Sequence, residues 1–239
     1  GMLRKLWVMP IDIRLSAHMS KLRFRPRSYS YFGAVPVLDV FDRPITDWDV
    51  VMKVLFDRII GTCALIALSP LMMVVAALIK LDSKGPVFFK QKRHGFNNDE
   101  IEVYKFRSLY THMTDQSVQK SVTKDDPRVT RVGRFIRKTS IDELPQLWNV
   151  VRGDMSVVGP RPERPHFANR FGAEIPAYQS RHRVMVGLTG WAAIHGLRGD
   201  TDIAERAHFD NLYIDNWSMW QDLKIIVRTV GSVFGRHGS

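Results

Sequence analysis

The feature that most constrains this chain is an apolar run, residues 59–79, that carries no charged side chain over roughly twenty positions. A helix of that length could span the hydrocarbon core of a bilayer once. Arg58 precedes the run and Lys80 follows it, so both of its ends are marked by charge. Such a segment must lie in lipid or be buried in a protein core. We expect the membrane, with a buried helix of a soluble protein as the alternative.

Ser69 and Pro70 interrupt the middle of this run. Proline removes one backbone hydrogen bond and clashes with the preceding turn, so the helix should bend there. The Ser69 hydroxyl can donate to a carbonyl one turn back, which lowers the cost of the break inside lipid. Because both flanks are basic, the positive-inside rule gives no preferred direction for a crossing. We therefore predict a re-entrant membrane helix hairpin over residues 46–84, broken at Ser69 and Pro70, that enters and leaves on the cytoplasmic face.

The charge balance points to anionic partners. The chain has 35 Lys and Arg against 24 Asp and Glu, a formal net charge of +11. Nucleic acid, acidic lipid headgroups and phosphorylated substrates would all suit that charge. The single cysteine, Cys63, lies in the apolar run and excludes an intramolecular disulfide. The first residues lack the features of a secretory signal, and no Walker loop, dinucleotide-binding fingerprint or nucleophile elbow occurs.

The segments after the apolar run alternate between strand and helix patterns. Residues 85–93 and 102–108 are predicted to be two short strands joined by a turn, whereas residues 109–131 resemble a surface loop. Leu144, Leu147, Trp148 and Val151 form an apolar helical stripe that stops at Gly153. Aromatic stretches at 209–217 and 219–220 suit either the headgroup layer of a membrane or core packing. Upstream, residues 34–41 are predicted to form one strand.

Two adjacent carboxylates, Asp142 and Glu143, are the strongest candidates for chemistry. Ser140 and Glu143 also fit a capping box, in which the serine accepts from a helical amide and the glutamate reaches back. Pro145 lacks an amide, so the start of the helix stays open between Ser140 and a later residue. Carboxylates near a helix N-terminus lie among free amides that also attract phosphate. A carboxylate held beside a phosphoryl group can attack it as a nucleophile.

That chemistry needs cations, because a carboxylate and a diphosphate repel each other. Lys105 and Arg107 precede the acidic pair, and Arg134 and Arg137 lead into it. Arg161 follows between two prolines, which restrict the backbone and lower the cost of presenting its guanidinium to a phosphate. Each cation alone is typical of a solvated surface. Together they favour a phosphate-binding site around Asp142.

At this point the residues resemble the bacterial sugar transferases, also called monotopic phosphoglycosyl transferases. The resemblance covers roughly residues 45–235, with several motifs in order. These motifs are residues 53–57 before the Ser69-Pro70 pair, 105–108, 126–130, 137–147, 153–162 and 187–191.

The resemblance implies an α/β, mostly helical fold: a re-entrant membrane hairpin with a small cytoplasmic catalytic domain, residues 85–239, that carries interfacial amphipathic helices and a short sheet. It implies an enzyme of the bacterial inner membrane that initiates exopolysaccharide synthesis. Asp142 would attack the sugar-linked phosphorus of a UDP-sugar and release UMP, and undecaprenyl phosphate would then accept the hexose phosphate. Glu143 would assist, Mg²⁺ near Asp142 would neutralise the diphosphate, and Arg137 and Arg161 would hold phosphate or the nucleotide.

The same resemblance extends to finer points. It adds Lys105, Arg107 and Asp154 as substrate or phosphate ligands. Residues 1–45 resemble the end of an upstream domain of larger members, and glucose is the favoured hexose with galactose as rival. The family usually has proline at position 186 and a polar amide at position 195, where this chain has Val186 and His195. We expect anionic membrane lipids as further partners, and a homo-oligomer stays open.

Two other classes of function compete with this one. A nucleic-acid-binding protein would explain only the charge, and a long apolar helix would hinder it, so no nucleic-acid partner is expected. A membrane-anchored scaffold would keep the apolar helix but has no need for Asp142, Glu143 and nearby arginines. Turnover of a nucleotide sugar separates the scaffold from the enzyme.

Overall fold

A computed structural model describes residues 13–16, 28–32, 35–41, 44–45, 47–113, 126–199 and 201–235 of this protein, with side chains from residue 44 on except at Asp47 and after residue 231. In its N-terminal part, β1 (Ile13–Ser16), β2 (Ser28–Phe32) and β3 (Val35–Phe41) form an antiparallel sheet in the order β1-β3-β2. The strand predicted over residues 34–41 is thus confirmed as β3. Most of the loop predicted over 109–131 lies outside the described residues, at 114–125.

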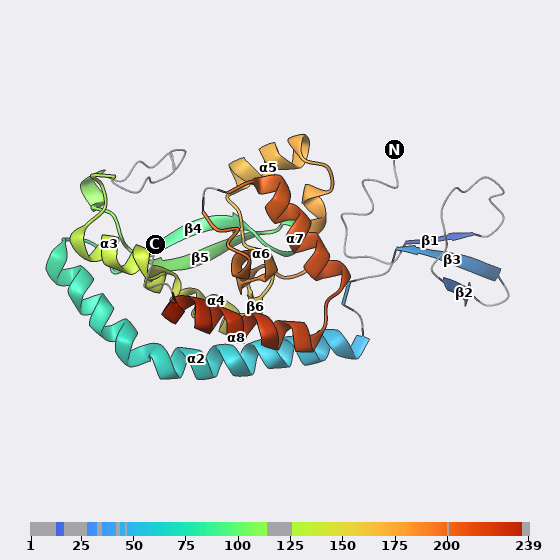
Figure 1. Cartoon of the computed structure of the whole chain (residues 1–239), viewed down its shortest axis with the longest axis horizontal. Helices are drawn as coiled ribbons and strands as arrows, with labels where there is room; N and C mark the ends of the chain where they lie inside the picture. The colour runs from blue at the N-terminus through green and yellow to red at the C-terminus, as the bar shows by residue number, and fades with distance from the viewer. Residues whose placement is uncertain are drawn as a thin grey trace.

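The apolar run forms the middle of one long helix, α2 (Asp47–Asp82), with Pro70 inside it. Figure 1 shows α2 along the lower edge of the molecule, curving upward in its second half toward α3 (Arg131–Lys138). The helix continues through Ser69 and Pro70 and is curved, which is typical of proline inside a helix. The predicted hairpin, broken at this pair, is therefore not confirmed. It is long and apolar enough to cross a membrane, and only 11% of its most apolar 18-residue window is buried. That exposure argues against the alternative of a core helix in a soluble protein.

The remaining elements form one domain over one face of α2. The two predicted strands are confirmed as β4 (Phe88–His94) and β5 (Glu100–Phe106), which pair antiparallel with Phe89 opposite Lys105. β6 (Ser156–Val158) and β7 (Gly187–Thr189) pair in parallel. The helices and 3₁₀ turns are η1 (Phe96–Asn98), η2 (Thr111–Met113), η3 (Ile141–Glu143), α4 (Gln146–Arg152), α5 (Pro165–Glu174), η4 (Tyr178–Arg183), α6 (Trp191–Ile194), α7 (Ile203–Asp215) and α8 (Met219–Gly235).

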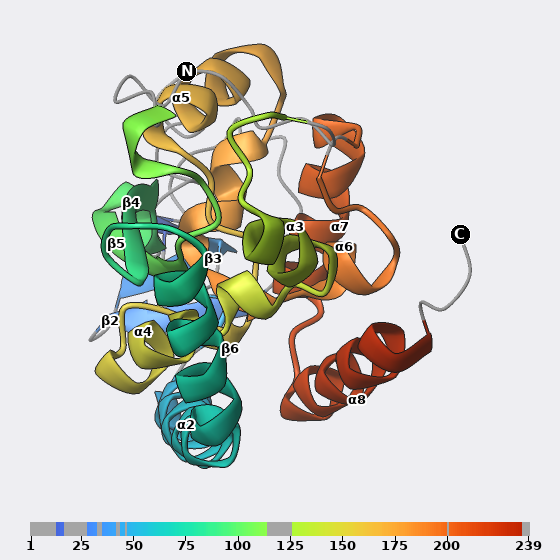
Figure 2. The ribbon, with the colours of Figure 1, turned by 90° about the vertical axis from the view of Figure 1, so that its left-hand side faces the viewer.

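Two apolar clusters hold this domain on α2. The larger combines β6, α4 and the last two helices, with Val150, Val186 and Ile225 wholly buried and Ile60 of α2 packed against it. The smaller joins Val75 and Ile79, beyond Pro70, to β5 and α3. Figure 2 views the end where α2 rises and shows α8 and the first half of α2 at the bottom of the molecule. Both halves of α2 thus pack against the same domain.

The helix that follows the acidic pair differs in part from its predicted stripe. It ends at Gly153 as expected, and Gly153 adopts φ 92°, a left-handed conformation that glycine accepts at low cost. Leu147 is buried, but Trp148 is 47% exposed. The buried face instead includes the polar Asn149, which accepts from the Tyr104 amide at 3.0 Å and donates to the Glu102 carbonyl at 2.6 Å. A buried polar anchor has no signature in an apolar pattern.

Of the two alternatives for the aromatic stretch at 209–217, the structure shows core packing for its central residues. Residues 209–215 of this stretch lie in α7, where Tyr213 and Ile214 are each 1% exposed. The Tyr213 hydroxyl donates to Asp222 at 2.7 Å, so its polar end is satisfied inside the core. Trp220, on α8, is by contrast 62% exposed.

The two positions that depart from the family pattern, 186 and 195, are both packed against other residues. Val186 is fully buried, and His195 packs between Trp191 and Phe209.

Candidate active site

The acidic pair lies in a tight turn between two short helices. Asp142 and Glu143 belong to η3, and Ser140 before them has φ 58° and ψ 14°, a left-handed backbone that costs a residue with a side chain roughly 1–2 kcal/mol. Ser140 makes no side-chain cap, and α4 begins later, at Gln146 after Pro145. The capping-box interpretation of Ser140 and Glu143 is therefore wrong. The reason is that Glu143 turns away from the helix to two cations.

Glu143 is held by Lys105 and Arg161. The Lys105 ammonium donates to Glu143 Oε1 at 2.7 Å, and the Arg161 guanidinium donates to Oε1 at 2.5 Å and to Oε2 at 3.0 Å. Burial alone would raise the pKa of Glu143, but the charges of Arg161 and Lys105 outweigh it and hold that pKa well below its ordinary value. Glu143 is therefore an anion at neutral pH and a poor proton donor.

Asp142 is in the opposite situation. Among the described residues its carboxylate has no hydrogen-bond or ion-pair partner. Burial raises the pKa of Asp142 to about 6, opposed by Lys105 and assisted by the charge of Glu143. An ionised carboxylate without a partner has both oxygens available for an electrophile. The two neighbouring acids thus differ: Glu143 is an anion bound by cations, and Asp142 is a carboxylate without a partner among the described residues.

Buried ion pairs hold the backbone of the segment that carries Arg161. Arg181 donates to the Arg161 carbonyl at 3.0 Å and pairs with Asp210 at 2.6 Å, and Arg181 is wholly buried. Glu163, two residues on, accepts from Arg206 at 2.9 Å. These buried pairs hold the backbone while the Arg161 side chain reaches Glu143.

Further cations surround the pair. Burial lowers the pKa of Arg93 to about 10. The negative charge of Glu163 opposes this shift, and the positive charge of Arg161 adds to it. Burial and the charge of nearby Arg137 outweigh Glu163 and lower the pKa of Arg164. The site therefore holds more positive charge than Asp142 and Glu143 can balance, which suits a diphosphate. Among these residues Arg93, Arg164 and Arg181 were not predicted, since no local pattern separates them from surface charges.

Two predicted ligands lie elsewhere. Arg107 donates from Nη1 to the Lys84 carbonyl at 2.5 Å and from Nη2 to Ser83 at 2.8 Å, so its guanidinium caps the end of α2. Asp154 follows α4 at the end opposite the acidic pair, where it accepts from Asn149 at 3.2 Å and faces Arg152 at 3.5 Å. The structure thus gathers Asp142, Glu143, Lys105, Arg137 and Arg161 in one site, and leaves Arg107 and Asp154 outside it.

The apolar helix is adapted to its proline. Pro70 cannot donate to the carbonyl of Ile66, and the Ser69 hydroxyl donates to that same carbonyl at 2.7 Å. The predicted hydrogen bond of the Ser69 hydroxyl to a carbonyl one turn back is therefore confirmed.

The first half of α2 is docked through buried charge. The Lys53 ammonium pairs with Asp222 of α8 at 2.6 Å and donates to the Val158 carbonyl at 3.1 Å, while Asp57 accepts from the Val157 amide at 3.1 Å. The helix is thus bonded to β6, the strand that leads into the segment carrying Arg161.

This site suits a divalent cation only when a bound substrate supplies further ligands. Among the described residues no group of three or more His, Cys, Asp or Glu side chains could enclose a metal. Mg²⁺, however, commonly binds through one or two carboxylates plus substrate phosphates and water. Asp142 supplies one free carboxylate, whereas both oxygens of Glu143 are engaged by cations. Asp142 is therefore the residue that would hold Mg²⁺, with substrate phosphates supplying further ligands.

The fold and the site define a domain mounted on an apolar helix, with one carboxylate that has no partner among the described residues and several cations around it. This chain belongs to the bacterial sugar transferase family, whose family model matches residues 48–236.

Three relatives give the similarity in detail. The chain is 47% identical over 216 residues to the undecaprenyl-phosphate glucose phosphotransferase of Komagataeibacter xylinus, which covers 86% of this chain and 40% of that protein. It is 39% identical over 241 residues to the UDP-glucose:undecaprenyl-phosphate glucose-1-phosphate transferase of Xanthomonas campestris pv. campestris, covering 98% of this chain and 50% of the relative. It is 45% identical over 197 residues to exopolysaccharide production protein PSS of Rhizobium leguminosarum bv. phaseoli, covering 79% of this chain and 98% of the relative. The chain therefore spans half or less of the length of the first two.

Proposed function

We propose that this chain transfers hexose 1-phosphate from a UDP-sugar to undecaprenyl phosphate, with glucose as the sugar, as the initiating step of exopolysaccharide assembly. The names of the Komagataeibacter and Xanthomonas relatives support the substrates, and that of the Rhizobium relative supports the pathway. The observation that carries the proposal is the division of the acidic pair: Glu143 is held by two cations while Asp142 is free.

The reaction would proceed in two displacements. An oxygen of Asp142 attacks the sugar-linked phosphorus, the bond from that phosphorus to the bridging oxygen breaks, and UMP leaves with the electron pair. Asp142 then carries the hexose phosphate as an acyl phosphate. A phosphate oxygen of undecaprenyl phosphate attacks the same phosphorus, the bond to Asp142 breaks, and the lipid diphosphate sugar leaves.

The surrounding residues would act by charge. Lys105 and Arg161 are oriented by Glu143, and with Arg137 they offset the developing charge on the diphosphate. Glu143 is a positioning residue in this scheme, since its low pKa opposes proton donation. Mg²⁺, for which Asp142 would be the protein ligand, would supply further neutralisation of phosphate charge when bound.

We infer that α2 is re-entrant, with the domain on the cytoplasmic face of the inner membrane. Lys53 near its start and Ile79 near its end contact the same domain, through β6 and through β5 and α3. A straight crossing would put those two ends on opposite sides of the bilayer. The curve at Pro70, with Ser69 satisfying the vacated carbonyl, allows both to stay on one side.

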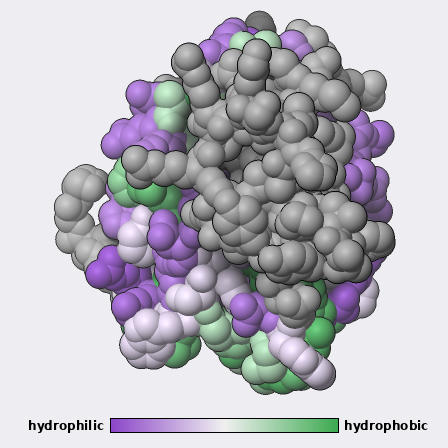
Figure 3. Space-filling model, turned by 90° about the vertical axis from the view of Figure 1, so that its right-hand side faces the viewer, coloured by the Kyte–Doolittle hydropathy of each residue, from purple (hydrophilic) through white to green (hydrophobic). Residues whose placement is uncertain are grey.

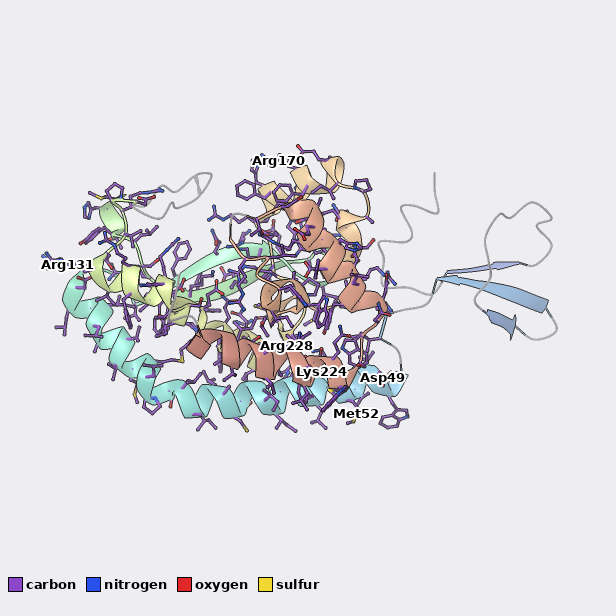
Figure 4. The ribbon with its side chains drawn as sticks, viewed as in Figure 1. Asp49, Met52, Arg131, Arg170, Lys224 and Arg228 are labelled. Carbon is purple, nitrogen blue, oxygen red and sulfur yellow. The ribbon has the colours of Figure 1, made fainter. Side chains whose placement is uncertain are left out.

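The exposed apolar side chains of α8 extend the proposed membrane-facing surface from α2 to α8. Trp220, Leu223, Val227 and Val230 are all exposed on α8 and recur at helical spacing, and Figure 3 shows hydrophobic residues gathered along the bottom of the molecule. Figure 4 labels Lys224 and Arg228 on the same helix, whose start is tied to the first half of α2 by the ion pair of Lys53 with Asp222. We infer that α8 lies in the headgroup layer, where its basic residues meet anionic lipids.

The test of function is UMP release from UDP-glucose and UDP-galactose, with Mg²⁺ and undecaprenyl phosphate, by the chain and by Asp142→Asn. Release that requires Asp142, with labelled sugar phosphate trapped on the protein when the lipid is omitted, is the expected result. Asp142→Glu is the matched control, because it keeps the charge and displaces the oxygen. Full activity in Asp142→Asn would overturn the mechanism, and faster release from UDP-galactose would overturn the choice of sugar.

The test of topology is labelling of single cysteines at positions 45 and 90 in a Cys63→Ser background, because Cys63 is exposed and would react. Both positions should react only from the cytoplasmic side. Labelling from opposite sides would show a true crossing.

A further inference from the structure

The outward face of α3 carries a basic stripe, defined as Arg131, Arg134, Phe135 and Lys138. These positions are spaced i, i+3, i+4 and i+7, so they lie on one face of the helix. All four side chains are exposed, and Phe135 is 61% exposed despite its size. The eight residues of α3 include no acidic side chain, so the helix itself does not neutralise the stripe.

The opposite face of α3 is fixed to the second half of α2. Ile136 packs with Val75 and Ile79, and the Val132 amide donates to Asp82 Oδ2 at 3.1 Å. A side chain at Gly133 would meet the Ser108 carbonyl at 2.2 Å, so only glycine allows this close approach. α3 is therefore held against the second half of α2, whose side chains beyond Pro70 include the exposed Leu78 and Leu81. In Figure 4, Arg131 lies where α2 ends.

The far end of the stripe leads to the nucleophile. Only residues 139–141 separate α3 from Asp142, and Arg137, in the last turn, contributes to the field at Asp142. From Arg131 to Lys138 the helix advances about 10 Å. The stripe thus forms a path of positive charge from the apolar surface of α2 to the active site.

We propose that the basic stripe receives the phosphate headgroup of the polyprenyl phosphate acceptor, with the prenyl chain running along the exposed apolar face of α2 beyond Pro70. This rests on the proposed function. The three cations complement a phosphate, and Phe135 offers an apolar contact to the first prenyl units. A UDP-sugar has no apolar chain and no need for this path. Donor and acceptor would therefore approach Asp142 from different sides, with Arg161 serving the donor.

The two half-reactions separate this proposal from a general role of the stripe. The full chain would be assayed in neutral detergent micelles without anionic phospholipid, so that membrane binding does not contribute. The variants are the double change Arg131→Gln with Lys138→Gln, and Phe135→Ser. Arg170→Gln is the matched control, an exposed arginine on α5 that Figure 4 places away from α2.

We expect the burst of UMP released without acceptor, and the KM for UDP-glucose, to be unchanged in both variants. The KM for undecaprenyl phosphate should rise at least about tenfold in the double variant, because about tenfold is the factor for losing one charge-assisted contact and two cations are removed. Phe135→Ser should raise it less, and Phe135→Leu should restore it. Arg170→Gln should change nothing.

Several outcomes would overturn the proposal. An unchanged acceptor KM, with weaker binding to vesicles of phosphatidylcholine and phosphatidylglycerol, would assign the stripe to bulk lipid. An equal fall in the UMP burst and in turnover would assign it to the donor or to folding, which thermal unfolding of the variants distinguishes. A wild-type chain without any burst would contradict the proposed function itself, and the acceptor site with it.

Discussion

Replacing Asp142 with asparagine should abolish transfer and at the same time stabilise the protein. Burial raises the pKa of this carboxyl from 3.8 to about 6, a shift of about two pKa units. Each unit corresponds to about 1.4 kcal/mol, so the ionised carboxylate costs the folded state at most about 3 kcal/mol at neutral pH. Solvent screening of this partly exposed group reduces the expected gain for Asp142→Asn to roughly 1–2 kcal/mol.

The pH dependence of this gain has a definite sign. Between pH 3.8 and about 6 the unfolded chain loses the Asp142 proton while the folded chain keeps it, so wild-type stability falls as pH rises through this range. Asparagine does not titrate. The difference between the variant and the wild type should therefore be small near pH 4 and complete above pH 7.

The assay is thermal unfolding in detergent, followed by tryptophan fluorescence, at pH 5 and pH 7.5. For a chain of this size a gain of 1–2 kcal/mol corresponds to roughly 2–8 °C in Tm. Glu143→Gln is the matched control: it also removes one carboxylate, but it leaves Lys105 and Arg161 without their partner and should lower the Tm. A lower Tm for Asp142→Asn at pH 7.5, or an equal shift at both pH values, would refute the argument from charge burial.

Three further predictions concern the nucleophile and the apolar helix. The single-turnover rate of UMP release should fall about tenfold from pH 7 to pH 5, because Asp142 with a pKa of about 6 becomes protonated; a flat profile would exclude it as the ionised nucleophile. Ser69→Ala should destabilise the membrane-bound chain by roughly 1 kcal/mol in reconstituted thermal unfolding, because the Ile66 carbonyl loses its donor, whereas Ser69→Thr should not. Asp222→Asn should lower the Tm, since Lys53 is buried with it, and protease cleavage near the start of α2 should increase by more than for the exposed control Asp215→Asn.

The local elements of this fold could be predicted because each follows from a short pattern. The charge-free run predicted a long apolar helix, and the Ser69-Pro70 pair predicted its bend and the hydroxyl contact that accompanies it. Strands β4 and β5 were predicted from interleaved basic and apolar residues. The acidic pair with its flanking cations predicted an anionic substrate near Asp142, and three of the predicted cations meet there.

What only the tertiary structure decided is which polar groups face each other. Arg107 and Arg161 were both predicted to bind phosphate, yet one caps α2 and the other binds Glu143. The difference between the pKa values of Asp142 and Glu143 also depends on residues from other segments. Lys105 of β5 and Arg161 after β6 bind Glu143, although both are distant in the sequence. A sequence determines hydrophobic periodicity and backbone restriction, because these act between neighbours along the chain. The partner, burial and pKa of a charged side chain depend on what other segments place around it, and these were decided by packing.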